Sequence, residues 1–175
     1  MKISKSFSAY PIPPGGVTGR CHILQESERN ALLEYFVKSL PDCYITQATL
    51  HERIKTTKKT ASELLANKVP DPGSIMSGDF GEITTLFFLS SECEENVKPM
   101  KKWRYKQDRN KAAPHSDVVV FYREFDDKPS ANDYVINAEA KQKSTKSSFD
   151  PIATAIAGIT KDQTCLLYTS DAADE

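Results

Sequence analysis

Two apolar runs decide the fold of this chain: Ser116-Asp117-Val118-Val119-Val120-Phe121-Tyr122 and Tyr134-Val135-Ile136-Asn137-Ala138-Glu139-Ala140-Lys141. Both are rich in β-branched and aromatic residues, which predicts two strands. Successive side chains of a strand point to opposite faces, so Glu139 and Lys141 share one face and Ala140 turns toward the packed layer. If the strands are neighbours, Asp117 joins that pair. Two carboxylates beside one ammonium group suit a divalent cation, a water molecule and a phosphodiester.

The Glu139-Ala140-Lys141 motif is weak evidence when it stands alone. Glu and Lys each make up one residue in ~15 of ordinary sequence, so such a triplet arises by chance roughly once in a couple of hundred residues. The alternative interpretation is that Asp117, Glu139 and Lys141 form only an ion-pair cluster on an antiparallel sheet. The context of the motif therefore decides between the two.

The stretch before these strands predicts a helix that begins near Ser77 or Asp79, either of which is a suitable cap. Its apolar residues follow a helical spacing at Ile83, Leu86, Phe87 and Leu89. Glu82 is then expected in the first turn. The helix dipole alone would favour a carboxylate there. The functional interpretation is that the helix packs on the sheet and brings Glu82 to the acidic cluster.

The order helix with Glu82, strand, strand with Asp117, strand with Glu139 and Lys141, and helix resembles the PD-(D/E)xK nuclease superfamily from about Gly78 to Gly158. More narrowly, Gly78-Asp79-Phe80-Gly81-Glu82, His115-Ser116-Asp117-Val118-Val119-Val120 and Ala138-Glu139-Ala140-Lys141 resemble the corresponding blocks of the HamA family, the nuclease subunit of the Hachiman antiphage system. The resemblance implies an α/β fold with a restriction-endonuclease-like core. It also implies a DNA nuclease that works beside a helicase subunit, HamB.

The resemblance implies a catalytic set of Glu82, Asp117, Glu139 and Lys141. Asp117 and Glu139 would hold Mg²⁺ or Mn²⁺, with the carbonyl oxygen of Ala140 as a further ligand. Lys141 would orient the attacking water, help to deprotonate it and offset negative charge in the transition state. Glu82 is expected as a metal ligand, directly or through water, or as the group that holds Lys141. The number of metal ions stays open. The alternative is a DNA-binding or regulatory subunit that has the nuclease fold without hydrolysis.

Basic residues flank the candidate site on both sides. Lys102, Arg104 and Lys106 alternate with aromatic residues, which predicts a strand with one basic face. That face suits contact with DNA, or equally an edge strand whose lysines prevent aggregation. Lys143 and Lys146 are expected to meet phosphates, with a solvated loop as the alternative. His115, two residues before Asp117, is expected to shape the turn rather than to bind substrate.

The first 70 residues predict an appended α+β section without an assignable role. Met1 to Gly19 is rich in proline and glycine and predicts turns with one short strand. A helix is expected from a Ser27 cap to Leu40, with Leu32, Leu33, Phe36, Val37 and Leu40 as its apolar stripe. A second helix is expected over about Lys58 to Ala66. Residues 71–74 then form a linker into the nuclease core, which is expected over residues 71–164.

The C-terminal part begins with Asp150-Pro151, a strong helix start with a cap and a proline in the first turn. Ile152 and Ile156 belong to the face that is expected to lie on the sheet. In the resembled fold a further strand follows this helix, and here that strand is missing, so the core is expected to be incomplete. Residues 165–175 back-translate, codon by codon, into a sequencing-library adapter, which indicates that they are not native. The alternative is a genuine acidic tail.

Composition adds few constraints. The formal net charge is −1, and it becomes +2 when Asp171, Asp174 and Glu175 are left out, so the chain is near neutral. The four cysteines are widely spaced, which indicates neither a zinc site nor a disulfide framework. No apolar run is long enough to span a membrane and no secretory leader is evident. The sequence therefore predicts a cytoplasmic protein.

Overall fold

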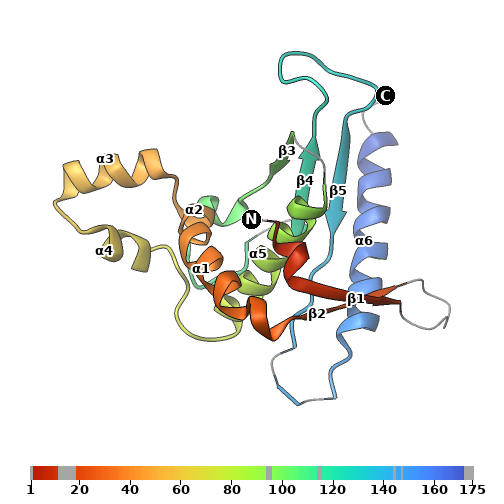
Figure 1. The fold of residues 1–175 in the computed structure, drawn as a ribbon. Coiled ribbons are helices and arrows are strands. Elements are labelled where there is room, and N and C mark those ends of the chain that lie inside the picture. The colour runs from red at the N-terminus through yellow and green to blue at the C-terminus, as the bar shows by residue number, and fades with distance from the viewer. Residues whose placement is uncertain are drawn as a thin grey trace.

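The computed structural model describes residues 2–11, 19–93, 96–113, 116–143, 145–146 and 148–171. Side chains beyond residue 161, and that of residue 11, are not part of this description. Figure 1 shows two small sheets surrounded by helices. The elements in chain order are η1 (Ile3–Ser6), β1 (Phe7–Pro11), β2 (Arg20–Leu24), η2 (Glu26–Glu28), α1 (Arg29–Ser39), α2 (Pro41–Tyr44), α3 (Gln47–Thr57), α4 (Ala61–Ala66), α5 (Ser74–Glu92), β3 (Val97–Pro99), η3 (Lys102–Tyr105), β4 (Val118–Tyr122), β5 (Tyr134–Ala138) and α6 (Pro151–Asp171).

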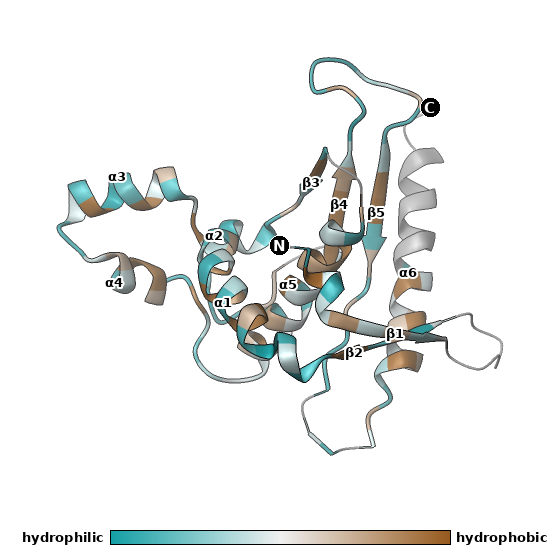
Figure 2. Cartoon of the chain, in the orientation of Figure 1, coloured by the Kyte–Doolittle hydropathy of each residue, from teal (hydrophilic) through white to brown (hydrophobic). Residues whose placement is uncertain are grey.

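The central sheet is an antiparallel meander in the order β3-β4-β5. β4 is its middle strand, with Val120 paired to Pro99 on one side and to Ile136 on the other. Val118 and Val120 point to one face of this strand and are buried, and α5 packs on β4. Figure 2 shows the hydrophobic colouring along β4. The prediction that the two apolar runs are neighbouring strands is confirmed. The order helix, three-strand meander, helix is also present, with β3 as the first strand in place of the predicted strand at Lys102 to Lys106. The restriction-endonuclease-like identity of this core stays a prediction.

α5 begins earlier than its sequence indicated. Gly73 is its N-terminal boundary and the first helical residue is Ser74, so neither Ser77 nor Asp79 is the cap. A turn at residues 72–73 directly precedes the helix, so the helix starts at Ser74 without an intervening loop. Glu82 therefore lies beyond the first two turns rather than in the first, and the helix dipole does not account for it. Asp79 is buried in the interior instead of capping the helix.

α6 starts as predicted. The Asp150 carboxylate accepts hydrogen bonds from the backbone N–H groups of Ile152 and Ala153, at 2.9 and 3.1 Å. The helix runs alongside β5 in Figure 1. It continues through residues 165–171, for which a non-native origin stays a prediction. Ile152 and Ile156, which were expected on the packed face, are exposed, so within residues 151–161 of α6 only some of the side chains are partly covered.

The N-terminal section contributes to the same hydrophobic core as the central sheet. The buried cluster joins residues from both sides of residue 70: Ile3, Leu32, Phe36, Cys43, Tyr44, Ile83, Leu86, Phe87, Trp103, Val118 and Val120. The division of the chain near residue 70 stays a prediction, but it does not separate two hydrophobic cores among these residues. β1 and β2 pair as an antiparallel hairpin in front of this core.

Both helices predicted in the first section are present as α1 and α4, but three details of them differ from the prediction. Ser27 lies in the short 3₁₀ helix η2, and α1 is bounded by Glu28 without a side-chain cap. Leu33 and Val37 are exposed, because the face of α1 that packs on the core passes through Leu32 and Phe36. The helix predicted from Lys58 begins only at Ala61, where Thr60 forms a capping box with Glu63. No sequence pattern indicated α3, which is mostly hydrophilic in Figure 2.

The predicted strand at Lys102 to Lys106 is also wrong. This segment forms the 3₁₀ helix η3, and Lys102 and Lys106 are buried because acidic partners on α5 draw them inward. No helix within the described part of the chain is both long and apolar enough to cross a membrane.

Candidate active site

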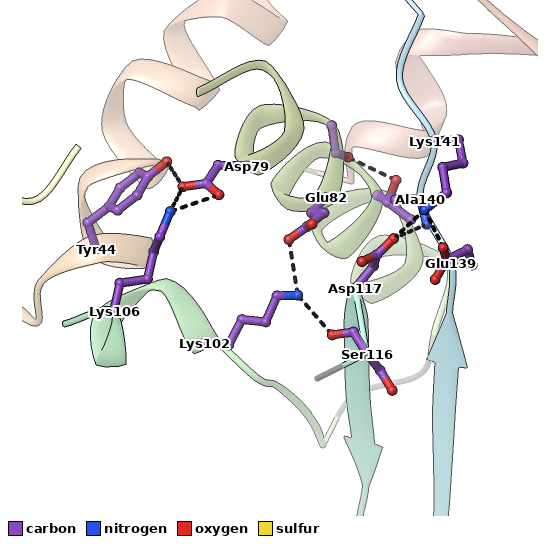
Figure 3. Close-up of polar contacts among 12 residues, drawn as sticks. Tyr44, Asp79, Glu82, Lys102, Lys106, Ser116, Asp117, Glu139, Ala140 and Lys141 are labelled. Atoms are coloured by element: carbon purple, nitrogen blue, oxygen red, sulfur yellow. Dashed lines mark hydrogen bonds and ion pairs between the residues drawn. The ribbon is translucent and has the colours of Figure 1, made fainter. Parts of the chain in front are cut away.

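The register of β4 and β5 brings Asp117 and Glu139 to one edge of the sheet. Val118 is paired with Ala138, and the two strands run in opposite directions. Asp117, which immediately precedes β4, therefore lies beside Glu139, which immediately follows β5. Figure 3 shows both carboxylates close to Lys141. The antiparallel pairing thus assembles the three residues that the sequence predicted to meet.

Lys141 bridges the two carboxylates. Its ammonium nitrogen lies 3.4 Å from Asp117 Oδ2 and forms a closer ion pair with Glu139 Oε1. Asp117 Oδ2 also accepts a hydrogen bond of 3.0 Å from the backbone N–H of Ala140. The hydrogen bond with Glu139 is the main reason that the pKa of Lys141 is raised. Lys141 therefore stays positively charged and neutralises part of the acidic pair.

Glu82 reaches the same region from α5. Lys102 Nζ lies 3.1 Å from Glu82 Oε2 and donates a hydrogen bond of 2.9 Å to the carbonyl oxygen of Ser116. Apart from this ion pair, Oε2 is buried without a hydrogen-bond partner among the described residues. Burial raises the pKa of Glu82 to about 7; Lys102 opposes this shift and the charge of Asp117 adds to it. One ammonium group thus ties Glu82 to the residue that precedes Asp117.

Two glycines allow helices to approach the segment after β5 closely. A Cβ atom on Gly158 of α6 would lie 2.5 Å from Glu139 Oε1, and one on Gly81 of α5 would lie 2.9 Å from Gln142 Oε1. Such distances are too short for real contacts, so side chains at these positions would displace the residues that flank Lys141. The segment from Glu139 to Gln142 is therefore held between α5 and α6.

An open pocket of about 580 Å³ lies over this site. Glu82, Asp117 and Lys141 line it together, and Lys143 lies at the same pocket. The N-terminal turn of α5 contributes Ser74 to its wall. The N–H groups of such a turn carry partial positive charge and favour anions. The pocket thus combines carboxylates, ammonium groups and a helix N-terminus.

Glu139 is not among the residues that line this pocket, because its carboxylate is paired with Lys141 and lies against α6. Within the described residues, no group of three or more acidic, histidine or cysteine side chains is placed to hold a metal ion. The expected metal ligands are therefore near one another but not gathered around one point.

The sequence shows which family this arrangement belongs to. The HamA family profile matches residues 4–175. The chain belongs to the HamA family. No curated protein and no solved structure matches it significantly. Family membership makes the chain a component of the Hachiman antiphage defence system, which consists of more than one subunit.

The basic residues of this HamA-family chain are distributed differently from the prediction. Lys102 pairs with Glu82, and Lys106 pairs with Asp79, while Arg104 forms an ion pair with Asp42. Lys102 and Lys106 thus point into the protein, where they pair with carboxylates of α5. The prediction had placed them on an exposed basic face of a strand. The role of these three residues in binding nucleic acid stays a prediction.

The remaining predicted contacts lie after β5 or outside the described residues. Lys143 Nζ donates a hydrogen bond of 2.7 Å to the carbonyl oxygen of Phe149, and Lys146 is exposed. Both would be accessible to a phosphate, and their role also stays a prediction. His115 lies outside the described residues.

Lys102 is the residue of this site that the sequence placed on a strand, whereas it lies in η3 and pairs with Glu82. One signal could have identified this pairing: Asp79 and Glu82 are spaced by three on a predicted helix, which places two carboxylates on one helix face where cations could pair with them. The two glycines had no comparable local signal, because their importance depends on what lies opposite them.

Proposed function

We propose that this HamA-family chain is a metal-dependent DNA nuclease that acts with a helicase partner. The observation that carries the proposal is the pocket in which Glu82, Asp117 and Lys141 meet beside the N-terminal turn of α5. Opposite charges directed at one opening suit a phosphodiester, whose phosphate requires cationic donors and whose hydrolysis requires an activated water. Support for the helicase partner comes from membership in a family of multi-subunit defence systems.

The residues around the pocket fit a divalent cation. Glu82 has one cationic partner, the Lys102 ammonium group at 3.1 Å from its buried Oε2, and Asp117 brings a second carboxylate to the same pocket. Carboxylate and carbonyl oxygens are the ligands that Mg²⁺ prefers, so Asp117, Glu82 and the carbonyl of Ala140 would hold Mg²⁺ or Mn²⁺. Glu139 is the further candidate ligand and is now paired with Lys141. When bound, the ion supplies Lewis-acid polarisation of the phosphodiester.

Lys141 would bind and orient rather than accept a proton. Its ammonium group donates to both Asp117 and Glu139 and stays charged beside them. A fixed positive charge at that place offsets the negative charge that develops on the phosphate. The N-terminal turn of α5 would favour the same phosphate group. Lys102 would act indirectly, because it fixes Glu82 relative to the Ser116–Asp117 segment.

One experiment tests the proposal. Plasmid cleavage by the full chain is measured with and without Mg²⁺ and with and without the helicase subunit. We expect metal-dependent cleavage that falls at least ~100-fold in a Glu139→Ala/Lys141→Ala double variant. The matched control is Glu26→Ala/Arg29→Ala, which removes an exposed ion pair of the first section and should leave cleavage unchanged.

A second function is favoured by one observation. Lys141 already neutralises Asp117 and Glu139, as it would in a purely structural ion-pair cluster. The chain would then be a DNA-binding or regulatory subunit without hydrolysis. No cleavage under any of the four conditions, with DNA binding unaffected by the double substitution, would establish this second function and overturn the first.

A further inference from the structure

Tyr105 is an exposed aromatic residue on a firmly anchored turn. Its side chain is 76% exposed, although its neighbour Trp103 is almost completely buried. Arg104 donates two hydrogen bonds to the carbonyl oxygen of Asp42, at 2.8 and 2.6 Å, and Lys106 is held by a buried ion pair. The backbone around Tyr105 is thus fixed on both sides. A ligand that stacks on this ring would bind a surface that is already ordered, which lowers the entropic cost of binding.

A basic groove adjoins this ring. A hollow of about 180 Å³ lies between η3, the N-terminal half of α3 and the segment that follows α4, and its lining includes Thr46, Thr49, Arg53, Lys68, Arg104 and Tyr105. No acidic side chain of the described residues lines it. The charge of Arg104 is offset by Asp42, whereas Arg53 and Lys68 form no ion pair with the described residues. The groove therefore presents two uncompensated cations next to an exposed aromatic ring.

The basic character continues along the arm formed by α3 and α4. This arm projects from the body of the molecule beside α2 in Figure 1. Lys55, Lys58 and Lys59 are exposed at its outer end. Tyr105 also lines a second hollow, of about 370 Å³, in which Lys111 pairs with Asp108. The ring thus borders two hollows, and the one beside α3 carries the uncompensated cations.

We infer that Tyr105 and the groove beside it bind single-stranded nucleic acid, at a place separate from the Glu82–Asp117 pocket. An unpaired base would stack on the Tyr105 ring, and adjacent phosphates would meet Arg53 and Lys68. Stacking of this kind needs a free base face, which a duplex does not offer. Tyr44 and Ile45 also line the groove, but Arg53 and Lys68, which form no ion pair with the described residues, favour a polyanionic nucleic acid over a neutral protein surface.

The test measures binding, so it does not depend on cleavage. The full chain is titrated, in EDTA, with fluorescent oligothymidylate and oligouridylate of about 20 nucleotides and with a duplex of equal length. We expect both single strands to bind more tightly than the duplex. Tyr105→Ala should weaken single-strand binding about 10-fold, and Tyr105→Phe, which keeps the ring, should retain it within about 2-fold. The matched control is Tyr10→Ala, an exposed tyrosine on the β1–β2 hairpin.

A second variant tests the phosphate interactions of the groove. Arg53→Gln/Lys68→Gln should lower the dependence of log affinity on log salt concentration by about 0.7 for each phosphate that is no longer neutralised. The thermal midpoint of each variant is measured to check that the fold is retained. We expect little change, because none of the three side chains is buried. The inference is overturned if Tyr105→Ala binds like the wild type, if Tyr105→Phe loses as much affinity as Tyr105→Ala, or if duplex binds as tightly as single strands. A difference between the DNA and RNA oligonucleotides identifies which nucleic acid the groove prefers.

Discussion

Two ion pairs join α5 to the segment of η3, one helical turn apart, and they differ in how completely the carboxylate is paired. Asp79 accepts hydrogen bonds from Lys106 Nζ at both oxygens, at 3.2 and 2.9 Å, and from the hydroxyl of Tyr44 at 3.2 Å. The side chains of Asp79 and Lys106 are each only 3% exposed. Glu82 has Lys102 as its partner, is 17% exposed and lines the open pocket.

The difference separates a fully paired, buried carboxylate from one that borders a pocket. Asp79 has no unused acceptor capacity that a ligand could reach, so its role is to fix α5 against η3. Glu82 has a single cationic partner, Lys102, and borders an open pocket that a ligand could enter. Figure 3 shows the two pairs side by side. Two carboxylate–lysine pairs one helical turn apart therefore differ in burial and in the number of partners.

The largest expected effect comes from breaking the Asp79 pair. Lys106→Met would leave a buried carboxylate without its cation, which costs about 3–5 kcal/mol of unfolding free energy. Urea denaturation without divalent cations measures the loss, with the exposed Lys111→Met as control. A loss below about 1 kcal/mol would mean that Lys106 contributes little to burying the charge of Asp79. The contrast between the Asp79 and Glu82 pairs would then be wrong.

The next effect is a pH dependence specific to Glu82. Its pKa is raised from 4.5 to about 7 in the folded state, so the folded state binds its proton more tightly than the unfolded state does. The resulting stability is fully present below about pH 4.5 and is lost as the pH rises to about 7. Glu82→Gln should therefore be more stable than the wild type at pH 8, by up to about 3 kcal/mol, and should lose most of this advantage at pH 4.5.

Thermal unfolding in EDTA at the two pH values checks this prediction. The control is Glu52→Gln, an exposed glutamate on α3, for which no such difference is expected. Equal stability of Glu82→Gln and the wild type at both pH values would show that Glu82 is not held in an unfavourable charged state.

A double-mutant cycle measures how strongly the second pair is coupled. Lys102→Met in the wild-type background should cost more stability than Lys102→Met in the Glu82→Gln background, with a coupling energy of about 1–2 kcal/mol. The reason is that the neutral amide of Gln at position 82 has no charge for the Lys102 ammonium group to offset. If the two substitutions are additive, Lys102 acts mainly through the carbonyl of Ser116 rather than through Glu82.

The smallest effect is expected at Tyr44, the second partner of Asp79. Tyr44→Phe removes one hydrogen bond to a carboxylate that keeps Lys106, so the expected loss is about 1 kcal/mol. Chemical denaturation measures it against Tyr35→Phe, whose ring packs on Phe87. A loss as large as that of Lys106→Met would show that the tyrosine, and not the lysine, secures Asp79.

The parts of the fold that sequence predicted are those with local signals. β4 and β5 follow from continuous runs of β-branched and aromatic residues, and the start of α6 follows from the Asp150–Pro151 cap. The meeting of Asp117, Glu139 and Lys141 follows from strand alternation and from one assumption, that the two runs are neighbours. These conclusions required little knowledge of distant contacts.

The parts that sequence could not predict depend on distant partners. The alternation of Lys102, Trp103, Arg104 and Tyr105 resembles a strand, but carboxylates about 20 to 60 residues away in the chain draw the cations inward and form a 3₁₀ helix instead. The contribution of Ile3 to the common core has no local signal either. The pairing of Glu139 with Lys141, away from the pocket, follows from the space that Gly158 leaves on α6.

The spacing of the two ion pairs also limits how the length of this protein can change. Asp79 and Glu82 keep their partners because both lie on one face of an uninterrupted helix. One residue inserted between them would rotate Glu82 by about 100° away from Lys102, and the pocket would lose a carboxylate although each of its residues was still present. The loop between β4 and β5, residues 123–133, carries no such constraint on the pocket. Changes of length in homologous chains are therefore expected in that loop and not between Asp79 and Glu82.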